Sequence, residues 1–322
     1  MIASGGPFKA AAVMAAPVFL DQSATVAKAC GLIEEAADHG AALIAFPEVF
    51  IPGYPYWIWL MTSTEGAPLY KRLYANAVTL DGPAVAAIGE AAARAKAYVV
   101  MGCSERDGGS LYNTLLYFDP AGALMGRHRK LQPTNAERTI WGMGDGSDLR
   151  VFDTDLGKLS GLICWEHTMD LARYALISMG EQIHIGAWPG GAAITHNPRA
   201  KFWSRMSESL QRGHAISGQT FVISVQSPVA PDTLEALGLA PDNDRLRIGG
   251  GWSAIINPWG EVIAGPLVDE EGILYADIDL SEIVGIKYLC DSAGHYARPD
   301  VLRLEFDAAP KPIATPLKRS TD

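Results

Sequence analysis

Short apolar runs alternate with amphipathic stretches along the whole chain, a pattern typical of α/β proteins. The first run, residues 9–19, predicts a buried strand, and residues 23–39 then place their apolar positions on one face of a helix. A second buried strand is predicted over residues 41–46. A helix is expected over residues 81–97, because Pro83 suits the first helical turn, and a strand follows at 98–104.

The second half of the chain continues the alternation with hairpins. Two are predicted where apolar runs flank a turn, pairing residues 111–118 with 123–128 and residues 149–153 with 159–164. Helices are predicted at 170–179 and 198–217, and strands at 183–187, 221–226, 252–257, 262–264 and 274–279. Because no linker separates two compositions, residues 1–290 predict one α/β domain with helix-covered mixed sheets. Residues 291–322 are Pro-rich and predict a tail that lies on the surface or wraps a neighbouring subunit.

Composition and charge exclude several classes of protein. The 322 residues are 48% hydrophobic and 19% charged, which is typical of a folded globular protein. A net charge of -10 argues against general binding to nucleic acid or acidic membranes. The apolar stretch near residues 10–20 could be a signal-peptide core, but Pro17 and the polar residues from Asp21 favour a strand and a helix start. No apolar run approaches the ~18 residues of a membrane span.

The four cysteines lack the spacing of a metal site or of a secreted disulfide scaffold. We therefore expect free thiols, a cytoplasmic protein and no bound metal. Cys164 stands where an apolar strand meets a polar turn, and α/β proteins commonly form their sites at such strand ends. A buried structural cysteine is the alternative for this residue taken alone.

Two further ionisable residues also follow predicted strands. Glu48 comes just after the strand at 41–46, and Lys130 ends the strand of a hairpin. Taken singly, they could be a surface or helix-capping glutamate and part of a solvated charge run. If they converge with Cys164, a carboxylate can act as base, a thiolate as nucleophile and a lysine as support for developing negative charge.

Residues 46–48 (Phe-Pro-Glu), 129–134 and 164–167 (Cys-Trp-Glu-His) resemble the three motifs of the nitrilase superfamily of carbon–nitrogen hydrolases. The resemblance covers essentially the whole chain. It implies a four-layer α-β-β-α sandwich without a cofactor, in which Glu48 is the base, Lys130 the electrophilic support and Cys164 the nucleophile. Glu137 matches a further glutamate of the family. The resemblance also implies pairing through the outer helices, with spirals or filaments as possible higher assemblies.

The residues after the cysteine resemble those of the nitrilase branch, as do residues 50–55 and 140–146. The implied reaction converts a nitrile to a carboxylic acid and ammonia through a thioimidate, with some amide as by-product. A cyanide-degrading enzyme and an aliphatic amidase of the same superfamily remain alternatives, as does an inactive binding protein that keeps the fold.

Aromatic side chains near the motifs could line the substrate pocket. We expect Tyr54, Trp165 and Trp188 to bind substrate, although ordinary core packing is an alternative for each. His167 is expected to support the site structurally rather than to transfer protons. Two positions depart from the family pattern, because Met14 stands where glutamine is usual and Ser217 where glutamate is common.

Overall fold

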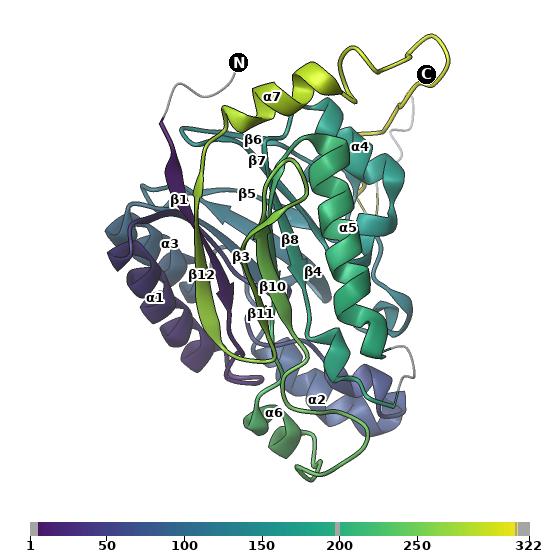
Figure 1. Ribbon diagram of the computed structural model, residues 1–322. Coiled ribbons are helices and arrows are strands. Elements are labelled where there is room, and N and C mark those ends of the chain that lie inside the picture. Colours follow the sequence, from purple (N-terminus) through teal and green to yellow (C-terminus); the bar gives the residue numbers. More distant parts are fainter. Residues whose placement is uncertain (1–5, 197–199, 313, 315–322) are drawn as a thin grey trace, which may run out of the picture.

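The structure is a computed structural model that describes residues 6–196, 200–312 and 314, and these residues form two six-stranded sheets packed face to face (Figure 1). The first sheet has the order β12-β1-β2-β3-β4-β5 and the second β11-β10-β9-β8-β7-β6. The first six strands are β1 (Phe8–Met14), β2 (Ala41–Ala45), β3 (Tyr98–Asp107), β4 (Ser110–Phe118), β5 (Leu124–Arg129) and β6 (Phe152–Thr154). The others are β7 (Gly157–Ile163), β8 (Ile183–Trp188), β9 (Phe221–Gln226), β10 (Trp252–Ile256), β11 (Val262–Val268) and β12 (Gly272–Ile278).

Helices cover the outer face of each sheet, as Figure 1 shows. The pair α1 and α3 packs on the first sheet, and α4 and α5 pack on the second. The helices are α1 (Gln22–Asp38), α2 (Ser63–Ala75), α3 (Pro83–Ala95), α4 (Asp170–Ser178), α5 (Trp203–Gly218), α6 (Pro231–Ala236) and α7 (Glu282–Leu289). The expected four-layer α-β-β-α sandwich is therefore confirmed.

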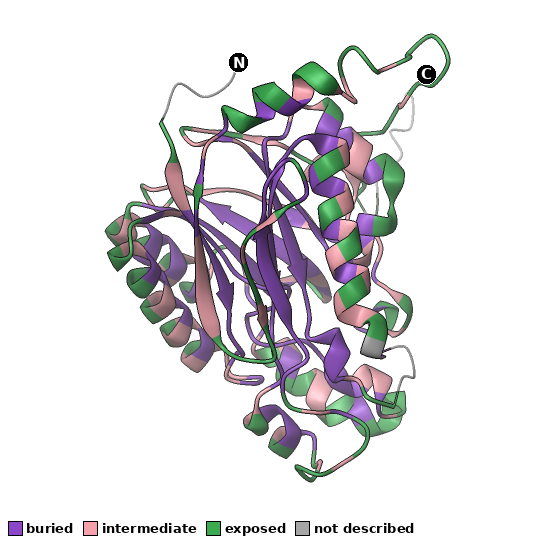
Figure 2. Cartoon of the chain, in the orientation of Figure 1, coloured by how far each residue is buried: buried purple, intermediate pink, exposed green. Residues whose placement is uncertain are grey.

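Successive residues of β1 serve two different cores, because side chains alternate across a strand. Ala10 and Ala12 face the layer between the sheets, whereas Ala11 and Val13 face α1 and α3. The strand is buried on both sides, and Figure 2 shows the interior strands of both sheets in the purple of buried residues. This explains why its sequence is apolar without alternation.

Most predicted elements are present, with differences at their ends. Both hairpins form, as β4–β5 and β6–β7. The first predicted strand extends too far, because β1 ends at Met14 and the chain then turns before α1. Of the helix predicted over 198–217, positions 198 and 199 lie outside the described residues, and α5 begins at Trp203 after a short 3₁₀ helix at Ala200–Phe202.

Three α-helices of the described residues were not predicted from the sequence, namely α2, α6 and α7. In α2, Gly66 and Pro68 interrupt the helical pattern, although Thr62 and Glu65 form a capping box at its start. Within the described part of the chain, none of the helices combines the length and apolarity needed to cross a bilayer. From Asp291 onward the described residues form turns followed by an irregular segment, and the backbone N–H of Lys311 donates to the Asp145 carboxylate at 2.7 Å.

Candidate active site

Cys164 lies at the end of β7, where the chain turns sharply into a 3₁₀ helix at Cys164–Thr168. Its φ is 55°, a left-handed conformation that is uncommon for a residue with a side chain. Such conformations persist where the surrounding structure holds them, and they are frequent at active sites. The side chain is almost completely buried, at 1% exposure.

Glu166 ties the cysteine turn to the strand end that carries Lys130. One carboxylate oxygen accepts from the backbone N–H of Leu131 at 2.7 Å, and the other accepts from the backbone N–H of Ile163 at 2.7 Å. His128 also bonds this carboxylate, at 2.9 Å. Burial alone would raise the pKa of Glu166, but His128 and the two N–H groups outweigh it and lower the pKa. Glu166 is therefore a buried carboxylate that fixes two strand ends relative to each other.

Glu48 reaches the same place from the turn after β2. This turn lies directly against β3, where a side chain at Gly102 would put its Cβ 1.9 Å from the carbonyl oxygen of Pro47. One Glu48 oxygen, Oε1, accepts from Lys130 Nζ at 2.9 Å and from Asn113 Nδ2 at 2.6 Å. Glycine at position 102 thus allows the close approach that brings the carboxylate to Lys130.

The second Glu48 oxygen, Oε2, is buried and has no hydrogen-bond partner among the described residues. A carboxylate oxygen of Glu48, one of Glu137 and Cys164 Sγ lie within 4.8 Å of one another. A buried polar atom without a partner is costly. Here it leaves one carboxylate oxygen available beside the thiol to accept a proton.

Lys130 is held between two carboxylates. Its ammonium donates to Glu48 Oε1 at 2.9 Å and to Glu137 Oε2 at 2.7 Å. Glu137 in turn accepts from the Thr134 backbone N–H at 2.7 Å and from the Tyr54 hydroxyl at 2.8 Å. Glu48, Glu137 and Cys164 carry groups that can bind a metal ion. The Lys130 ammonium, however, already supplies the positive charge between the two carboxylates.

The ionisation of these groups follows from burial and from their neighbours. Burial raises the pKa of Glu48 to about 7, against the opposing effect of Lys130. Burial and the Glu48 carboxylate raise the pKa of the Cys164 thiol well above its usual value, while Lys130 and the Trp165 backbone N–H oppose the rise. Burial would lower the pKa of Lys130, but Glu137 and Glu48 raise it well above the usual range. The resting site therefore combines a protonated thiol, an ammonium and a carboxyl poised to titrate near neutral pH.

A cavity of about 820 Å³ opens beside this group of side chains. Its wall is largely apolar, and polar groups are contributed by Tyr54, Glu137, Thr134, Asn135 and His196. The other lining residues are Trp59, Trp165, Pro189, Gly191, Ile194, Ala200, Phe202, Trp203 and Met206. A large apolar cavity with a few convergent polar groups is typical of a small-molecule site.

The three expected substrate-binding aromatics lie in different places. Tyr54 and Trp165 line the cavity, and Tyr54 also bonds Glu137. Trp188 is fully buried outside the lining, stacked on His167 with ring centroids 5.1 Å apart and edge-on to Trp203. Trp188 therefore supports the wall formed by Trp203 rather than forming that wall itself.

Sequence reasoning did not single out Asn113, His128 or Glu166, although all three bond the site. Asn113 lies in the middle of β4, where an amide among apolar residues is a weak signal. Glu166 belongs to the recognised motif, but its contacts to Leu131 and Ile163 depend on how two distant strand ends meet.

The two departures from the family pattern also have visible settings. Met14 is fully buried, and its side chain packs against Gly251. A Cβ at position 251 would lie 2.4 Å from Met14 Cε, so the packing requires glycine there. Ser217 accepts a hydrogen bond from Arg173 Nη2 at 2.9 Å, so α4 and α5 are joined through it.

Comparison with known proteins identifies the family of this chain. The family model described as "Carbon-nitrogen hydrolase" matches residues 9–288. The chain is 45% identical over 306 residues to a nitrilase of Bacillus sp. (strain OxB-1), which covers 94% of this chain and 89% of that protein. It is 46% identical over 313 residues to an aliphatic nitrilase of Rhodococcus rhodochrous, covering 95% of this chain and 84% of that protein.

A solved carbon-nitrogen hydrolase from Helicobacter pylori G27 has the same fold. The two structures superpose with a TM-score of 0.75 at 22% identity, covering 91% of this chain and 96% of that one. Fold, motif geometry and sequence identity over nearly the full length thus agree, and the chain belongs to the carbon–nitrogen hydrolase family of the nitrilase superfamily.

Proposed function

We propose that this protein is a nitrilase, which hydrolyses a nitrile to its carboxylic acid and ammonia. The observation that carries the proposal is the partnerless oxygen of Glu48 in the same buried group as Cys164 Sγ and Lys130 Nζ, beside an apolar cavity. Relatives named as nitrilases, 45% and 46% identical over almost the whole chain, support the same conclusion.

Glu48 acts as the base in this scheme. It takes the proton of Cys164 as the sulfur bonds to the nitrile carbon, and that proton passes to the nitrile nitrogen to give a thioimidate. The Lys130 ammonium stabilises the negative charge that develops on this nitrogen, together with the backbone N–H of Trp165. Glu137 orients the ammonium through its 2.7 Å ion pair.

Two waters complete the reaction. The first adds to the thioimidate carbon with Glu48 as base, and ammonia leaves to form a thioester. The second water hydrolyses the thioester, which releases the acid and restores the thiol. If the carbon–sulfur bond breaks before the carbon–nitrogen bond, the product is the amide.

The cavity favours a nitrile with an apolar substituent over hydrogen cyanide. A volume of about 820 Å³ far exceeds the needs of a triatomic substrate, and Ile194, Met206 and Trp203 offer apolar contacts. Tyr54 and Trp165 are proposed to contact this substituent, with Trp188 behind Trp203 in the wall of the cavity. The aliphatic amidase remains the second candidate, since the same three groups can attack a carbonyl carbon.

The deciding experiment incubates the full-length protein with matched nitriles and amides and measures ammonia, acid and amide separately. We expect acid and ammonia from nitriles, and loss of both in Cys164→Ala. Turnover of the amides without turnover of any nitrile would favour the amidase. Inertness towards the whole panel would favour a protein that keeps the fold without the activity.

We also propose a homodimer formed through α4 and α5, with higher spiral or filament assembly possible. Leu171 on α4 and Ile216 on α5 are exposed by 70% and 51%, as expected for apolar residues of a contact surface. Beyond the proposed domain of residues 1–290, the tail exposes Leu302 by 79% and is proposed to lie at such an interface. Sedimentation velocity of the wild type and of Leu171→Asp tests this, and an unchanged sedimentation coefficient would contradict the assigned surface.

The compartment we propose is the cytoplasm. All four cysteines, namely Cys30, Cys103, Cys164 and Cys290, are free thiols. Free thiols persist in reducing compartments, where a nucleophilic cysteine stays in its active form. The proposed partner is the small nitrile alone, because the net charge of -10 disfavours nucleic acid and acidic membrane surfaces.

A further inference from the structure

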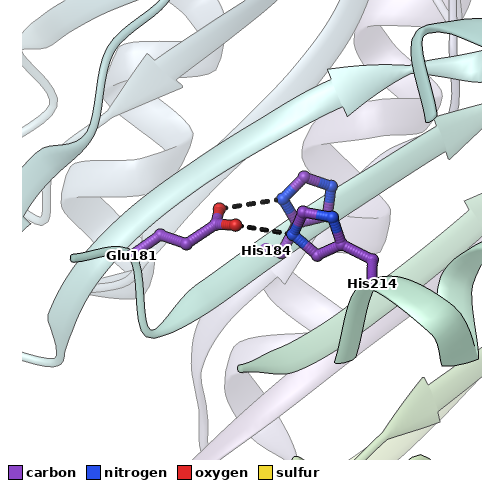
Figure 3. Close-up of side chains that lie close together, drawn as sticks. All are labelled: Glu181, His184 and His214. Carbon is purple, nitrogen blue, oxygen red and sulfur yellow. Dashed lines mark hydrogen bonds and ion pairs between the residues drawn. The ribbon is translucent and has the colours of Figure 1, made fainter. Parts of the chain in front are cut away.

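A second group of titratable side chains lies behind the cysteine turn, away from the cavity. Figure 3 shows Glu181, from the loop before β8, bonded to two histidines. Its Oε2 lies 3.0 Å from His184 Nδ1, and its Oε1 lies 2.5 Å from His214 Nε2. His184 belongs to β8 and His214 to α5, and the side chains of all three are fully buried.

These contacts continue to the backbone of the nucleophile. His184 Nε2 lies 3.0 Å from His167 Nε2, and His167 Nδ1 lies 2.7 Å from the carbonyl oxygen of Cys164. At the far end, Arg173 Nε donates to His214 Nδ1 at 3.4 Å. We call the series from the Cys164 carbonyl through His167, His184 and Glu181 to His214 the histidine chain.

The protons needed by the histidine chain can be counted. Each of its four contacts needs one hydrogen: carbonyl to His167, His167 to His184, His184 to Glu181, and Glu181 to His214. Arg173 supplies its own hydrogen to His214 Nδ1, so the hydrogen of a neutral His214 ring is on Nε2. Three neutral imidazoles and an ionised carboxylate together carry only three hydrogens that can form these hydrogen bonds, one N–H on each ring. The four contacts therefore require one proton more than these groups hold in their ordinary neutral-pH forms.

Without that proton, one contact would bring two lone pairs together. If His167 donates to the Cys164 carbonyl and His184 donates to Glu181, the two Nε2 atoms face each other unprotonated at 3.0 Å. With the proton, one of these rings is an imidazolium whose charge is balanced by Glu181, or Glu181 itself is protonated. Either arrangement leaves the buried group close to neutral, which burial favours.

The surrounding charges disfavour any proton beyond the one that the four contacts require. Burial lowers the pKa of both His167 and His184, the neighbouring His214 lowers both further, and His184 also lowers the pKa of His167. Arg173, which faces the chain from α4, lowers both further, whereas Glu181 raises the pKa of His184. The hydroxyl of Ser160, on β7, also donates to Glu181 and brings its own hydrogen.

The chain acts on one peptide group of the active site. The carbonyl that His167 holds belongs to the peptide between Cys164 and Trp165, and the N–H of the same peptide lies against the Cys164 thiol. We propose that His167, His184 and Glu181 are positioning residues that share one buried proton and thereby fix this peptide, with its N–H aimed at the reacting atoms. The kinetic part of this inference rests on the proposed nitrilase activity.

Glu181, His184 and His214 are also ligand types for a divalent metal such as Zn²⁺. Their geometry fits a proton better, because Glu181 Oε1 and His214 Nε2 are 2.5 Å apart. Two ligands of one tetrahedral zinc, each about 2.0–2.2 Å from the metal, lie farther apart than that.

Solid-state NMR of protein labelled with ¹⁵N in its histidine side chains tests the proton count directly, whatever the size of the assembly. The probe is the protein itself, at neutral pH, with the Glu181→Gln variant beside it. In the variant the Gln amide can donate to His184 while its oxygen accepts from His214, so every contact is satisfied by neutral rings. If the extra proton lies on a ring, the wild type should show an imidazolium signal that the variant lacks. If it lies on Glu181, the rings should be neutral in both proteins, with a hydrogen on His184 Nε2.

An unprotonated Nε2 on both His167 and His184 in the wild type would overturn the inference. Stoichiometric metal in the purified protein, measured by elemental analysis, would also overturn it. Both readouts are independent of turnover, so they remain decisive even if no nitrile is hydrolysed. In that case the proposed function fails while the proton count is still tested.

Kinetics on an accepted nitrile test the positioning role. His184→Phe breaks the chain, and we expect kcat to fall on the order of 10²-fold with little change in KM, because a displaced catalytic peptide costs about that much. Glu181→Gln should stay within about threefold of the wild type, since its hydrogen bonds are kept. Ser160→Ala, which removes a neighbouring bond outside the chain, is the matched control and should behave like the wild type. Equal losses in Glu181→Gln and His184→Phe would contradict a role based on hydrogen bonding.

Discussion

The carboxylate of Glu166 accepts the backbone N–H of Leu131 at 2.7 Å, which joins the turn of the nucleophile to the residue that follows Lys130. The same carboxylate also accepts the backbone N–H of Ile163 and bonds His128. Two of the three motifs are thus fixed to each other through a residue that does not touch the cavity. Glu166 belongs to the cysteine motif, yet its contacts are those of a structural anchor.

Replacing Glu166 with Gln should therefore destabilise the fold as well as the activity. The amide nitrogen of the glutamine would face the N–H group of Leu131 or Ile163, which the carboxylate oxygen had accepted. The buried His128 would also lose its counter-charge. We expect the free energy of unfolding to fall by about 3 kcal/mol, as when one partner of a buried pair is removed. Chemical denaturation measures this.

The control is Glu34→Gln, whose ion pair with Arg94 is exposed on the surface. Exposed pairs contribute about 0–1 kcal/mol, so this variant should unfold almost as the wild type does. Equal stability of both variants would show that Glu166 is not an anchor.

The pH profile should report the Glu48 carboxyl. Burial raises its pKa to about 7, and only the ionised form can accept the thiol proton. The value of kcat/KM should therefore rise with pH through about 7 and level off above it. Asn113 Nδ2 donates to Glu48 and holds this pKa down.

Asn113→Ala removes that donor, so the carboxyl should hold its proton to higher pH. The acid limb of the profile should then move to higher pH, with part of the activity recovered in alkaline buffer. Initial rates across a pH series measure the shift. A limb that stays in place or moves to lower pH would mean that another group controls the rise.

The chemistry and much of the fold were predictable because both depend on local patterns. Glu48, Lys130 and Cys164 each follow the end of a strand, namely β2, β5 and β7, and α/β proteins commonly form their sites at such strand ends. The doubly apolar sequence of β1 likewise follows from its burial between two layers. Both features can be recognised from a short stretch of sequence, without knowledge of which segments meet in the fold.

The histidine chain was not predictable in the same way. Glu181, His184 and His214 lie on a loop, on β8 and on α5, and none of them belongs to a recognised motif. Only packing of α5 on the second sheet brings His214 to Glu181. The helix α2 was missed for a local reason, since Pro68 and Gly66 conceal a segment that a capping box starts.

Glu137 should matter more than the tyrosine that it binds. It holds Lys130 in an ion pair at 2.7 Å, whereas Tyr54 contributes one hydrogen bond from an uncharged hydroxyl at 2.8 Å. Glu137→Gln keeps the volume but presents an amide to donors, and we expect kcat to fall on the order of 10²-fold or more, as when an electrostatic support of a reaction is lost. Tyr54→Phe should lower kcat by about tenfold, the cost of one hydrogen bond from an uncharged hydroxyl to a carboxylate.

Steady-state kinetics of the two variants on the same nitrile measure this difference. Glu137→Gln should leave substrate affinity nearly unchanged, because its effect acts through the lysine. If Tyr54→Phe lost as much kcat as Glu137→Gln, the tyrosine would have to act on the substrate directly.

The last prediction concerns the size of the substrate. Ile194 lines the cavity, and a tryptophan in its place would occupy space that we assign to the substituent of the nitrile. For an aryl nitrile we expect KM to rise by about tenfold or more, since overfilling a packed space typically costs 1–3 kcal/mol. Propionitrile should be turned over almost as before, because its short chain does not reach the filled region.

The control is Ile263→Trp, which makes the same change on exposed β11, away from the cavity. It should leave the KM and kcat of both substrates unchanged. Equal kinetics of the aryl nitrile in both variants would place its binding site elsewhere.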